Sequence, residues 1–415
     1  MAAVREDFKG KSPFYPGQPV PVELFVGREA LLERLLERGV GQVTAGKPMA
    51  FYVQGEYGIG KSSLARFTQW LAAKDQQVYG IYAALGGART LIDMVAIIME
   101  ATLRSGIFEP QRLEKIKNWL ARYLGKQSLF GFTINFEALK RDAPNFSTPF
   151  GMLGFLTELR HQLGETEIRG LFLVLDEING ITVDPQFTHF IKGMLDTNAL
   201  APKPLPLLLM LCGVEERRRE MIKKHQPIER YFDVIEVLPM TPEEVQEFYG
   251  KAFESVHVEV TDEAKQIMSY WSAGFPKIMH LIGDAAFWLD KDNLIDGQDA
   301  EEAVFLAAEE VGKKYVDQQV YRALRSKDYQ SILKKIASLD PNSMAFTKKQ
   351  VAIDLTETEK TKLNNFLTRM QKLQVIRKGD VAGEYLFNQR MIRLYIWLDS
   401  VEKRKRTTHS KTRAE

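Results

Sequence analysis

The segment that most constrains this chain runs from Gly55 to Ser62 and reads Gly-Glu-Tyr-Gly-Ile-Gly-Lys-Ser. It follows a short apolar stretch, Phe51 to Val53, and opens a stretch with a helical pattern, Ser62 to Ala72. Between a strand and a helix, this spacing of glycines before Lys-Ser forms a loop whose backbone N–H groups and helix N-terminus wrap phosphates. The pattern predicts a nucleotide-binding loop; a purely structural glycine turn is the alternative.

The residues of this loop have separate expected roles. Lys61 would bind the phosphates as a point charge, the Ser62 hydroxyl would hold Mg²⁺, and Ser63 would contact the α-phosphate. The remaining predicted contacts come from the loop backbone, at Gly55, Gly58, Ile59 and Gly60. The predicted cofactors are therefore ATP and Mg²⁺.

A pair of carboxylates follows a second apolar run. Leu171 to Leu175 ends in Asp176-Glu177, at the edge of a parallel sheet where ligands gather. We expect Asp176 to hold the coordination shell of Mg²⁺ and Glu177 to polarise the attacking water as a general base. Alone, such a pair can be a solvated strand end; Lys61 upstream favours the catalytic interpretation.

Further apolar runs alternate with helical patterns, as expected for a parallel sheet covered on both faces. These runs are Val78 to Tyr82, Leu205 to Leu211 and Val234 to Leu238. We therefore assign residues 1–240 to an α/β core. From Thr241, which starts a helix through Pro242 and a capping box with Glu244, every element has a helical pattern, which predicts a helical lid over residues 241–312.

The C-terminal part combines two short helices, a longer helix and two strands around a turn. This order predicts a winged helix-turn-helix over residues 313–400, followed by a disordered basic tail, 401–415. From Lys313 onward the chain has 23 Lys and Arg against 11 Asp and Glu, a net charge of +12; the preceding 312 residues have 33 and 43, a net of −10. Such asymmetry indicates a polyanion partner such as double-stranded DNA, with a solvated basic surface as the alternative.

Composition excludes several other classes of protein. The chain has one cysteine, Cys212, so neither an internal disulfide nor a cysteine-cluster zinc site can form, and its six histidines lack metal-ligand spacing. No apolar run is long enough to span a membrane, and the first residues lack the apolar segment of a signal peptide. We expect a cytoplasmic protein without a membrane partner.

With the two motifs established, the sequence resembles the AAA+ and STAND-like ATPases of the origin-recognition and archaeal-ATPase type. The resemblance covers about Leu24 to Leu289 and includes Phe25-Val26-Gly27-Arg28-Glu29, which in that family precedes the phosphate loop and lies against the adenine. It implies that Val26 and Gly27 line the base pocket, and that Arg28 is structural or faces the nucleotide.

Two basic residues gain a role only through this resemblance. Lys277, in Gly274-Phe275-Pro276-Lys277, is similar to a second sensor that reaches the γ-phosphate, while an exposed lysine is the alternative. Arg230 resembles an arginine finger given to a neighbouring subunit, with Arg217, Arg218 and Arg219 as competitors and a surface ion pair as the plain alternative. The chain departs from the family's replication-type members at Leu211 to Val214, where no polar first sensor is present.

Two functions remain at this stage. One is an ATP-hydrolysing AAA+ ATPase that couples nucleotide state to homo-oligomer assembly and DNA binding. The other is a STAND-like signalling or defence ATPase, with a protein partner, whose winged helix is an internal regulatory module. The basic C-terminal part favours the first function, and the missing polar sensor favours the second.

Overall fold

The computed structural model describes residues 10–17, 21, 25–105, 110–123, 129–130, 133–134, 146–164, 167–322, 324–337, 339, 344–379, 381 and 383–399. The predicted tail, 401–415, lies outside them. Contacts divide the chain into two compact units, one of Pro19–Leu238 and one of Met1–Gln18 with Pro239–Glu415. We describe each unit by itself. Within the described residues, no helix has the length and apolar character needed to cross a lipid bilayer.

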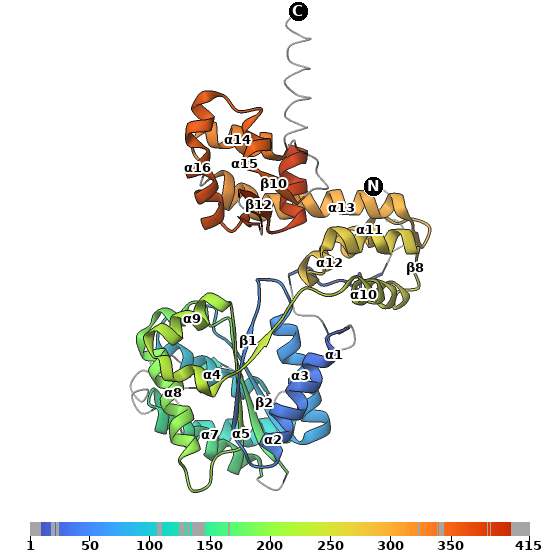
Figure 1. Ribbon diagram of the computed structural model, residues 1–415. Helices are drawn as coiled ribbons and strands as arrows, with labels where there is room; N and C mark the ends of the chain where they lie inside the picture. The colour runs from blue at the N-terminus through green and yellow to red at the C-terminus, as the bar shows by residue number, and fades with distance from the viewer. Residues whose placement is uncertain are drawn as a thin grey trace, which may run out of the picture. The chain divides into compact units, whose positions relative to one another are not determined.

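A five-stranded parallel sheet forms the centre of the first unit (Figure 1). Its strands lie in the order β2-β5-β6-β1-β7. Their bounds are β1 Met49–Gln54, β2 Val78–Ala84, β5 Gly170–Asp176, β6 Leu207–Gly213 and β7 Asp233–Glu236. Since the strands are parallel, their carboxyl ends lie at one edge of the sheet. The predicted α/β fold with a parallel sheet is confirmed.

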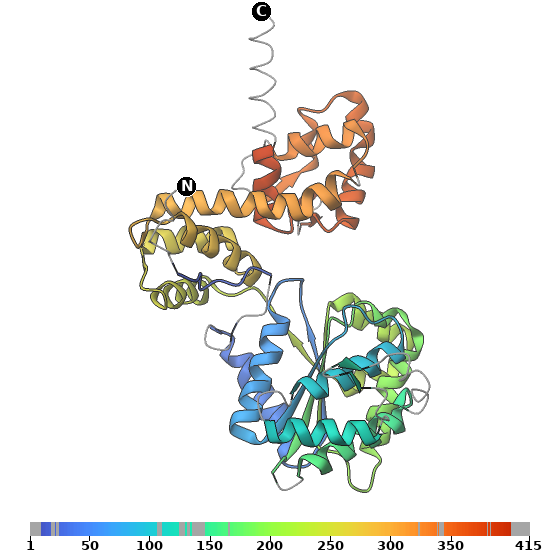
Figure 2. The same ribbon diagram turned by 180° about the vertical axis from the view of Figure 1, so that it is seen from behind.

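Helices cover both faces of this sheet, as Figures 1 and 2 show from opposite sides. One face packs on α1 Glu29–Leu35, η2 Leu36–Gly41, α2 Gln42–Thr44 and α3 Lys61–Gln76. The other packs on α4 Leu91–Ser105, α5 Pro110–Tyr123, α7 Pro149–Leu163, α8 Pro185–Ala199, η5 Gln226–Tyr231 and, at its margin, α9 Glu215–Lys224. Remaining short elements are the hairpin β3 Leu129–Phe130 with β4 Thr133–Ile134, and η4 Ile181–Val183.

Burial on both faces explains why the central strands are continuously apolar. In β5, Leu171, Leu173 and Leu175 enter the core on the α4 side, while Phe172 and Val174 are buried toward α3. A half-buried strand would alternate with polar residues. The continuous run therefore identified the strand and its central place.

The lid of the second unit is mostly helical. It contains α10 Pro242–Glu254, α11 Asp262–Ser272, α12 Pro276–Leu289 and α13 Gly297–Val311, which continues into η6 Gly312–Tyr321. The capping box of Thr241 and Glu244 starts α10 as the sequence predicts. The expectation that every lid element is helical is wrong, because β8 Glu259–Val260 pairs in parallel with β9 Leu294–Ile295. Two-residue strands are too short to leave a period in the sequence.

An N-terminal segment packs into this lid although it lies far away in the sequence. Phe14 is buried, with its ring 5.0 Å from that of Phe253 on α10 and 6.1 Å from that of His280 on α12. The backbone N–H of Tyr15 donates to Nδ1 of His280 over 3.1 Å. A Cβ atom at Gly283 would lie 2.3 Å from the Phe14 ring, so only glycine leaves room for it. No sequence motif marks this contact.

The C-terminal module alternates helices with a small antiparallel sheet of order β10-β12-β11. Its elements are α14 Lys327–Ala337, β10 Ala345–Thr347, α15 Lys348–Ala352, α16 Glu357–Lys372, β11 Ile376–Lys378 and β12 Glu384–Phe387. Capping boxes at Thr347 and Thr356 start α15 and α16. The helices and the strands β11 and β12 lie in the order expected from the sequence, and the identity of the module as a winged helix-turn-helix stays a prediction. The sequence did not predict β10, which has only three residues.

Gly274 should be needed for lid stability. Its φ is +73°, and an added Cβ atom would lie 2.1 Å from the carbonyl oxygen of Met240. We expect Gly274→Ala to lower the free energy of unfolding by about 2 kcal/mol or more. Gly250 on α10 is the matched control because its Cβ position is open, so Gly250→Ala should raise stability by up to about 1 kcal/mol. Urea denaturation measures both, and equal stability of the two variants would contradict the expectation.

Candidate functional site

The glycine-rich loop lies between the end of β1 and the start of α3. Ile59 is buried and anchors it, while Gly60 has a φ of +96° that a side chain would strain. Helix α3 begins at Lys61, so the N–H groups of its first turn lie at the end of the glycine-rich loop. Such a helix N-terminus attracts anions. The loop thus has the geometry expected for phosphate binding.

Lys61 spans the mouth of this loop. Its ammonium group donates to the carbonyl oxygens of Gly55, over 2.9 Å, and Glu56, over 2.8 Å. Burial lowers the pKa of Lys61, whereas the nearby Asp176 carboxylate raises it. The Lys61 ammonium group therefore lies close enough to the Asp176 carboxylate for their charges to interact, although the two residues are 115 positions apart in the sequence.

The Phe25 to Glu29 segment packs against the loop and α3. The ring of Phe25 stacks on Phe67 of α3, with 4.3 Å between centroids. Arg28, in a left-handed conformation with φ of 64°, donates to the carbonyl oxygen of Ile59 and, over 3.4 Å, to that of Leu238. Val26 is buried and Gly27 has a φ of +72°. The structure therefore brings Val26 and Gly27 beside the phosphate loop.

Asp176 and Ser62 meet at a residue that the sequence did not single out. The hydroxyl group of Tyr82, on β2, donates to Oδ2 of Asp176 and also lies within hydrogen-bonding reach of the Ser62 side chain. Oδ1 of Asp176 accepts from the Glu177 N–H over 2.8 Å. A carboxylate and a hydroxyl are oxygen ligands of the kind Mg²⁺ prefers. The side chains present fit the predicted metal.

Glu177 lies directly after β5 in a left-handed conformation, with φ of 55°, and is exposed. Its carboxylate lies against Gly86, in the loop that follows β2; a Cβ atom at Gly86 would be 2.2 Å from Oε2. Positive φ is uncommon for a residue with a side chain and often accompanies function. Here the chain turns at Glu177, whose side chain is exposed at the edge of the sheet, whereas the preceding Asp176 is buried.

Strand β6, between β5 and β1, ends in Cys212 and Gly213. Cys212 is fully buried, and burial raises the pKa of its thiol. A polar side chain reaches the end of β6 from the segment that follows β5: Oδ1 of Asn179 accepts a hydrogen bond from the Val214 N–H over 3.4 Å. Asn179, which the sequence analysis did not consider, thus places an amide at the end of β6, where a polar first sensor is absent from the strand itself.

The arginines considered as fingers have different environments. Arg217 and Arg219 pair with Glu220 and Glu215 on α9, and Arg218 donates to Gln54. Arg230 is 68% exposed; it donates to the Tyr231 hydroxyl, which raises its pKa, and its guanidinium lies 4.0 Å from Asp196. Of the four, Arg230 has the most exposed side chain, as a group that acts on a neighbouring subunit requires. Its role stays a prediction.

Lys277 lies in the first turn of lid helix α12. Burial lowers its pKa, and the charge of Lys314 lowers it further. Pro276 is the first residue of this helix, directly after Gly274 and Phe275. Because Lys277 belongs to the second unit, its sensor role also stays a prediction.

The sheet order, the phosphate loop after β1 and the carboxylates after β5, which is separated from β1 by β6, define a P-loop fold of the AAA+ type. The structure is similar to the ORC2 protein of Aeropyrum pernix, solved as ADPNP-ADP complexes, with a TM-score of 0.59 and 13% identity over 92% of this chain and 95% of that chain. It is also similar to the Walker-type ATPase PABY2304 of Pyrococcus abyssi, with a TM-score of 0.53 and 19% identity over 90% and 96% of the two chains.

At these identities the similarity concerns the fold. No protein-family model and no curated protein sequence matches the chain. The resemblance expected from Phe25 to Glu29 and the two motifs is confirmed at the level of an origin-recognition-like AAA+ fold.

Proposed function

We propose that this protein binds ATP with Mg²⁺ and hydrolyses it. The observation that carries the proposal is the convergence of Lys61, Ser62 and Asp176 from two strand ends, which puts an ammonium group, a hydroxyl and a carboxylate at one loop. Such a set binds phosphates and a hard cation together. The Walker-type ATPase and the nucleotide complexes among similar folds support it.

Each residue then has a defined task. The N–H groups at Gly58 to Ser63 and the Lys61 ammonium hold the phosphates, while Ser63 adds the α-phosphate contact. Val26 and Gly27 line the adenine side. Ser62 and Asp176 would hold Mg²⁺, which would supply positive charge to offset that of the phosphates. Glu177 would orient and polarise the attacking water, and Lys277 is expected to act as the second sensor of the γ-phosphate.

Two substitutions separate binding from chemistry. Lys61→Ala should abolish ATP binding because it removes the main positive charge in the loop, whereas Lys74→Ala, at the other end of α3, should not. Glu177→Gln should retain ATP and lose about 10²-fold or more in hydrolysis rate, because the amide cannot accept the proton of the water. Calorimetric titration measures binding and phosphate release measures turnover. A folded Lys61→Ala protein with unchanged ATP affinity would refute the proposal.

We further propose that ATP is hydrolysed between subunits of a homo-oligomer, with Arg230 supplied in trans. Its exposure supports this role, since a finger must leave its own subunit. Mixing Arg230→Ala subunits with Glu177→Gln subunits should restore part of the activity, because some interfaces then combine an intact finger with an intact base. Arg219→Ala is the control, as Arg219 pairs with Glu215. A strictly monomeric enzyme with full activity would exclude the role.

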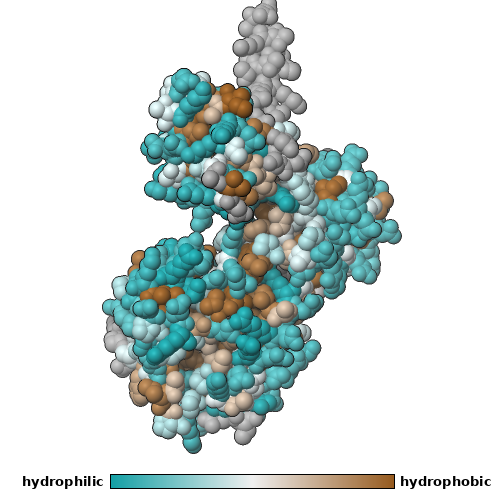
Figure 3. Space-filling model, in the orientation of Figure 1, coloured by the Kyte–Doolittle hydropathy of each residue, from teal (hydrophilic) through white to brown (hydrophobic). Residues whose placement is uncertain are grey.

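The C-terminal module is proposed to be a winged helix that binds double-stranded DNA through phosphate contacts. Helix α16 carries Lys360, Lys362, Arg369 and Lys372, but Lys360 pairs with Glu357 and Lys362 with Asp328. Arg377 and Lys378 of β11, in the wing, are exposed. On the face seen in Figure 3, this module is largely hydrophilic. Within the described residues no ion pair is found for Arg377 or Lys378, so these wing charges are expected to carry more of the contact than Lys360 and Lys362 of α16.

The salt dependence of DNA affinity tests this proposal. Each phosphate contact contributes a slope of about −0.9 in a plot of log affinity against log salt. The double variant Arg377→Ala/Lys378→Ala should weaken binding to all duplexes and make the slope shallower by about 1.8. Lys313→Ala/Lys314→Ala changes net charge equally but removes lysines paired with Glu309 and Glu310, and should have less effect. Deletion of residues 401–415 should cost less than the wing variant.

A STAND-like signalling ATPase is the second candidate function. The absence of a polar residue at the end of β6 favours it, because the first sensor of replication-type members is missing there. In this case the C-terminal module is an internal regulatory element with a protein partner. Full-length protein with ATP that binds no duplex at about 50 mM salt, where phosphate contacts are strong, would put this function first.

A further inference from the structure

Tyr82 stands between the two side chains proposed to hold magnesium. Its hydroxyl group donates to Oδ2 of Asp176 and lies within reach of Ser62. Since the Glu177 N–H already bonds Oδ1, each oxygen of Asp176 accepts a hydrogen bond from the protein. A cation that uses Oδ2 must compete with a hydrogen bond to a charged group, which is among the stronger kinds.

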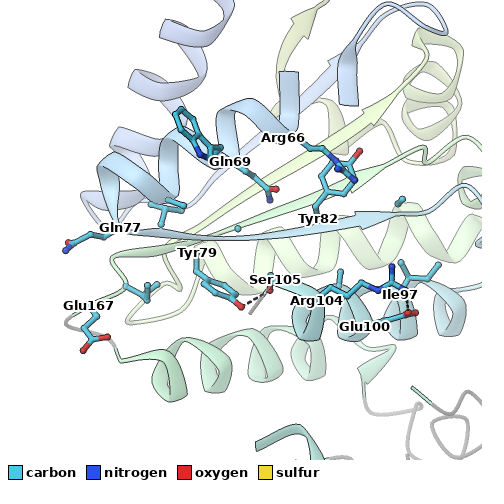
Figure 4. Close-up of a pocket in the computed structure, with 17 residues that line it drawn as sticks. Arg66, Gln69, Gln77, Tyr79, Tyr82, Ile97, Glu100, Arg104, Ser105 and Glu167 are labelled. Carbon is cyan, nitrogen blue, oxygen red and sulfur yellow. Dashed lines mark hydrogen bonds and ion pairs between the residues drawn. The ribbon is translucent and has the colours of Figure 1, made fainter. Parts of the chain in front are cut away.

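The position of Tyr82 is fixed by the sheet and by α3. In the register of β2 with β5, Tyr82 lies opposite Val174, two residues before Asp176. The Arg66 guanidinium, one turn after Ser62 on α3, lies 4.4 Å from the centre of the Tyr82 ring, and Figure 4 shows the two side chains together.

Space for movement of the ring lies beside it. A groove of about 1050 Å³ runs along β2, the edge strand of the sheet, and both Tyr82 and Arg66 line it (Figure 4). Arg66 is exposed and Tyr82 is partly buried. The groove therefore offers space into which the Tyr82 ring can move when its hydroxyl leaves Asp176.

We propose that Tyr82 is a positioning residue that controls magnesium binding: its hydroxyl group holds Asp176 and Ser62 together, and this link must open for the metal to use both. The inference rests on the ATPase function proposed above. Tyr82 competes with the metal and not with the phosphates. Removing its hydroxyl should consequently strengthen metal binding and leave nucleotide binding without metal unchanged.

Tyr82→Phe tests this directly, since it keeps the ring and removes only the hydroxyl. The dissociation constant of Mn²⁺, titrated by electron paramagnetic resonance into protein with ADP, should fall about 3- to 10-fold. Arg66→Gln, which loosens the ring but keeps the hydroxyl, should shift it in the same direction by less. Tyr79→Phe is the matched control, because it removes a hydroxyl on the same strand that bonds Ser105 over 2.7 Å, away from the metal ligands.

The outcomes separate this inference from the function on which it rests. ADP affinity measured in EDTA should be equal in wild type and Tyr82→Phe. If wild type binds no ADP in EDTA or with Mn²⁺, both the proposed function and the inference fail. If ADP binds but Mn²⁺ affinity in Tyr82→Phe is unchanged or weaker, the inference alone is overturned. A shift of equal size in Tyr79→Phe would assign the effect to a general change in strand β2 and would also overturn it.

Discussion

Strand β6, inserted between β5 and β1, sets the distances on which the site depends. Parallel pairing places all three carboxyl ends at one edge, so that the loop after β1 and the carboxylates after β5 face the same region across a single strand. Adjacent strands lie roughly 5 Å apart, so the end of β6 lies between the phosphate loop and Asp176. The residues there are Cys212 and Gly213, and Asn179 brings an amide beside them.

The sequence predicts this site well where the chemistry is local. Gly55 to Ser62 needs no tertiary information, because the glycines, the lysine and the helix start are contiguous. The continuous apolar run before Asp176 likewise identifies a strand buried on both faces. The first lid helix was predicted because Thr241 marks its N-terminus through a capping box. In each case the sequence carries both the residue and its structural context.

Interactions between distant parts of the chain could not be predicted in this way. Tyr82 appears in the sequence as one aromatic residue of an apolar strand, and only the pairing of β2 with β5 brings its hydroxyl to Asp176. Arg28 has two possible roles in the sequence, and only the structure shows that its side chain donates to the carbonyl oxygen of Ile59. The short strands β8, β9 and β10 leave no pattern, since two or three residues do not define a period. What the sequence lacks in these cases is the identity of the partner.

Burial of Phe14 in the lid affects the order in which the protein can fold during synthesis. Tyr15 and its partner His280 are 265 residues apart. At about 5–20 residues per second, the ribosome takes roughly 13–50 s to make the chain between them. During this interval the nucleotide-binding sheet can be completed, while the segment around Phe14 has no site to enter. An apolar side chain at the beginning of the chain is thus exposed to chaperones and to other nascent chains until the last lid helices emerge.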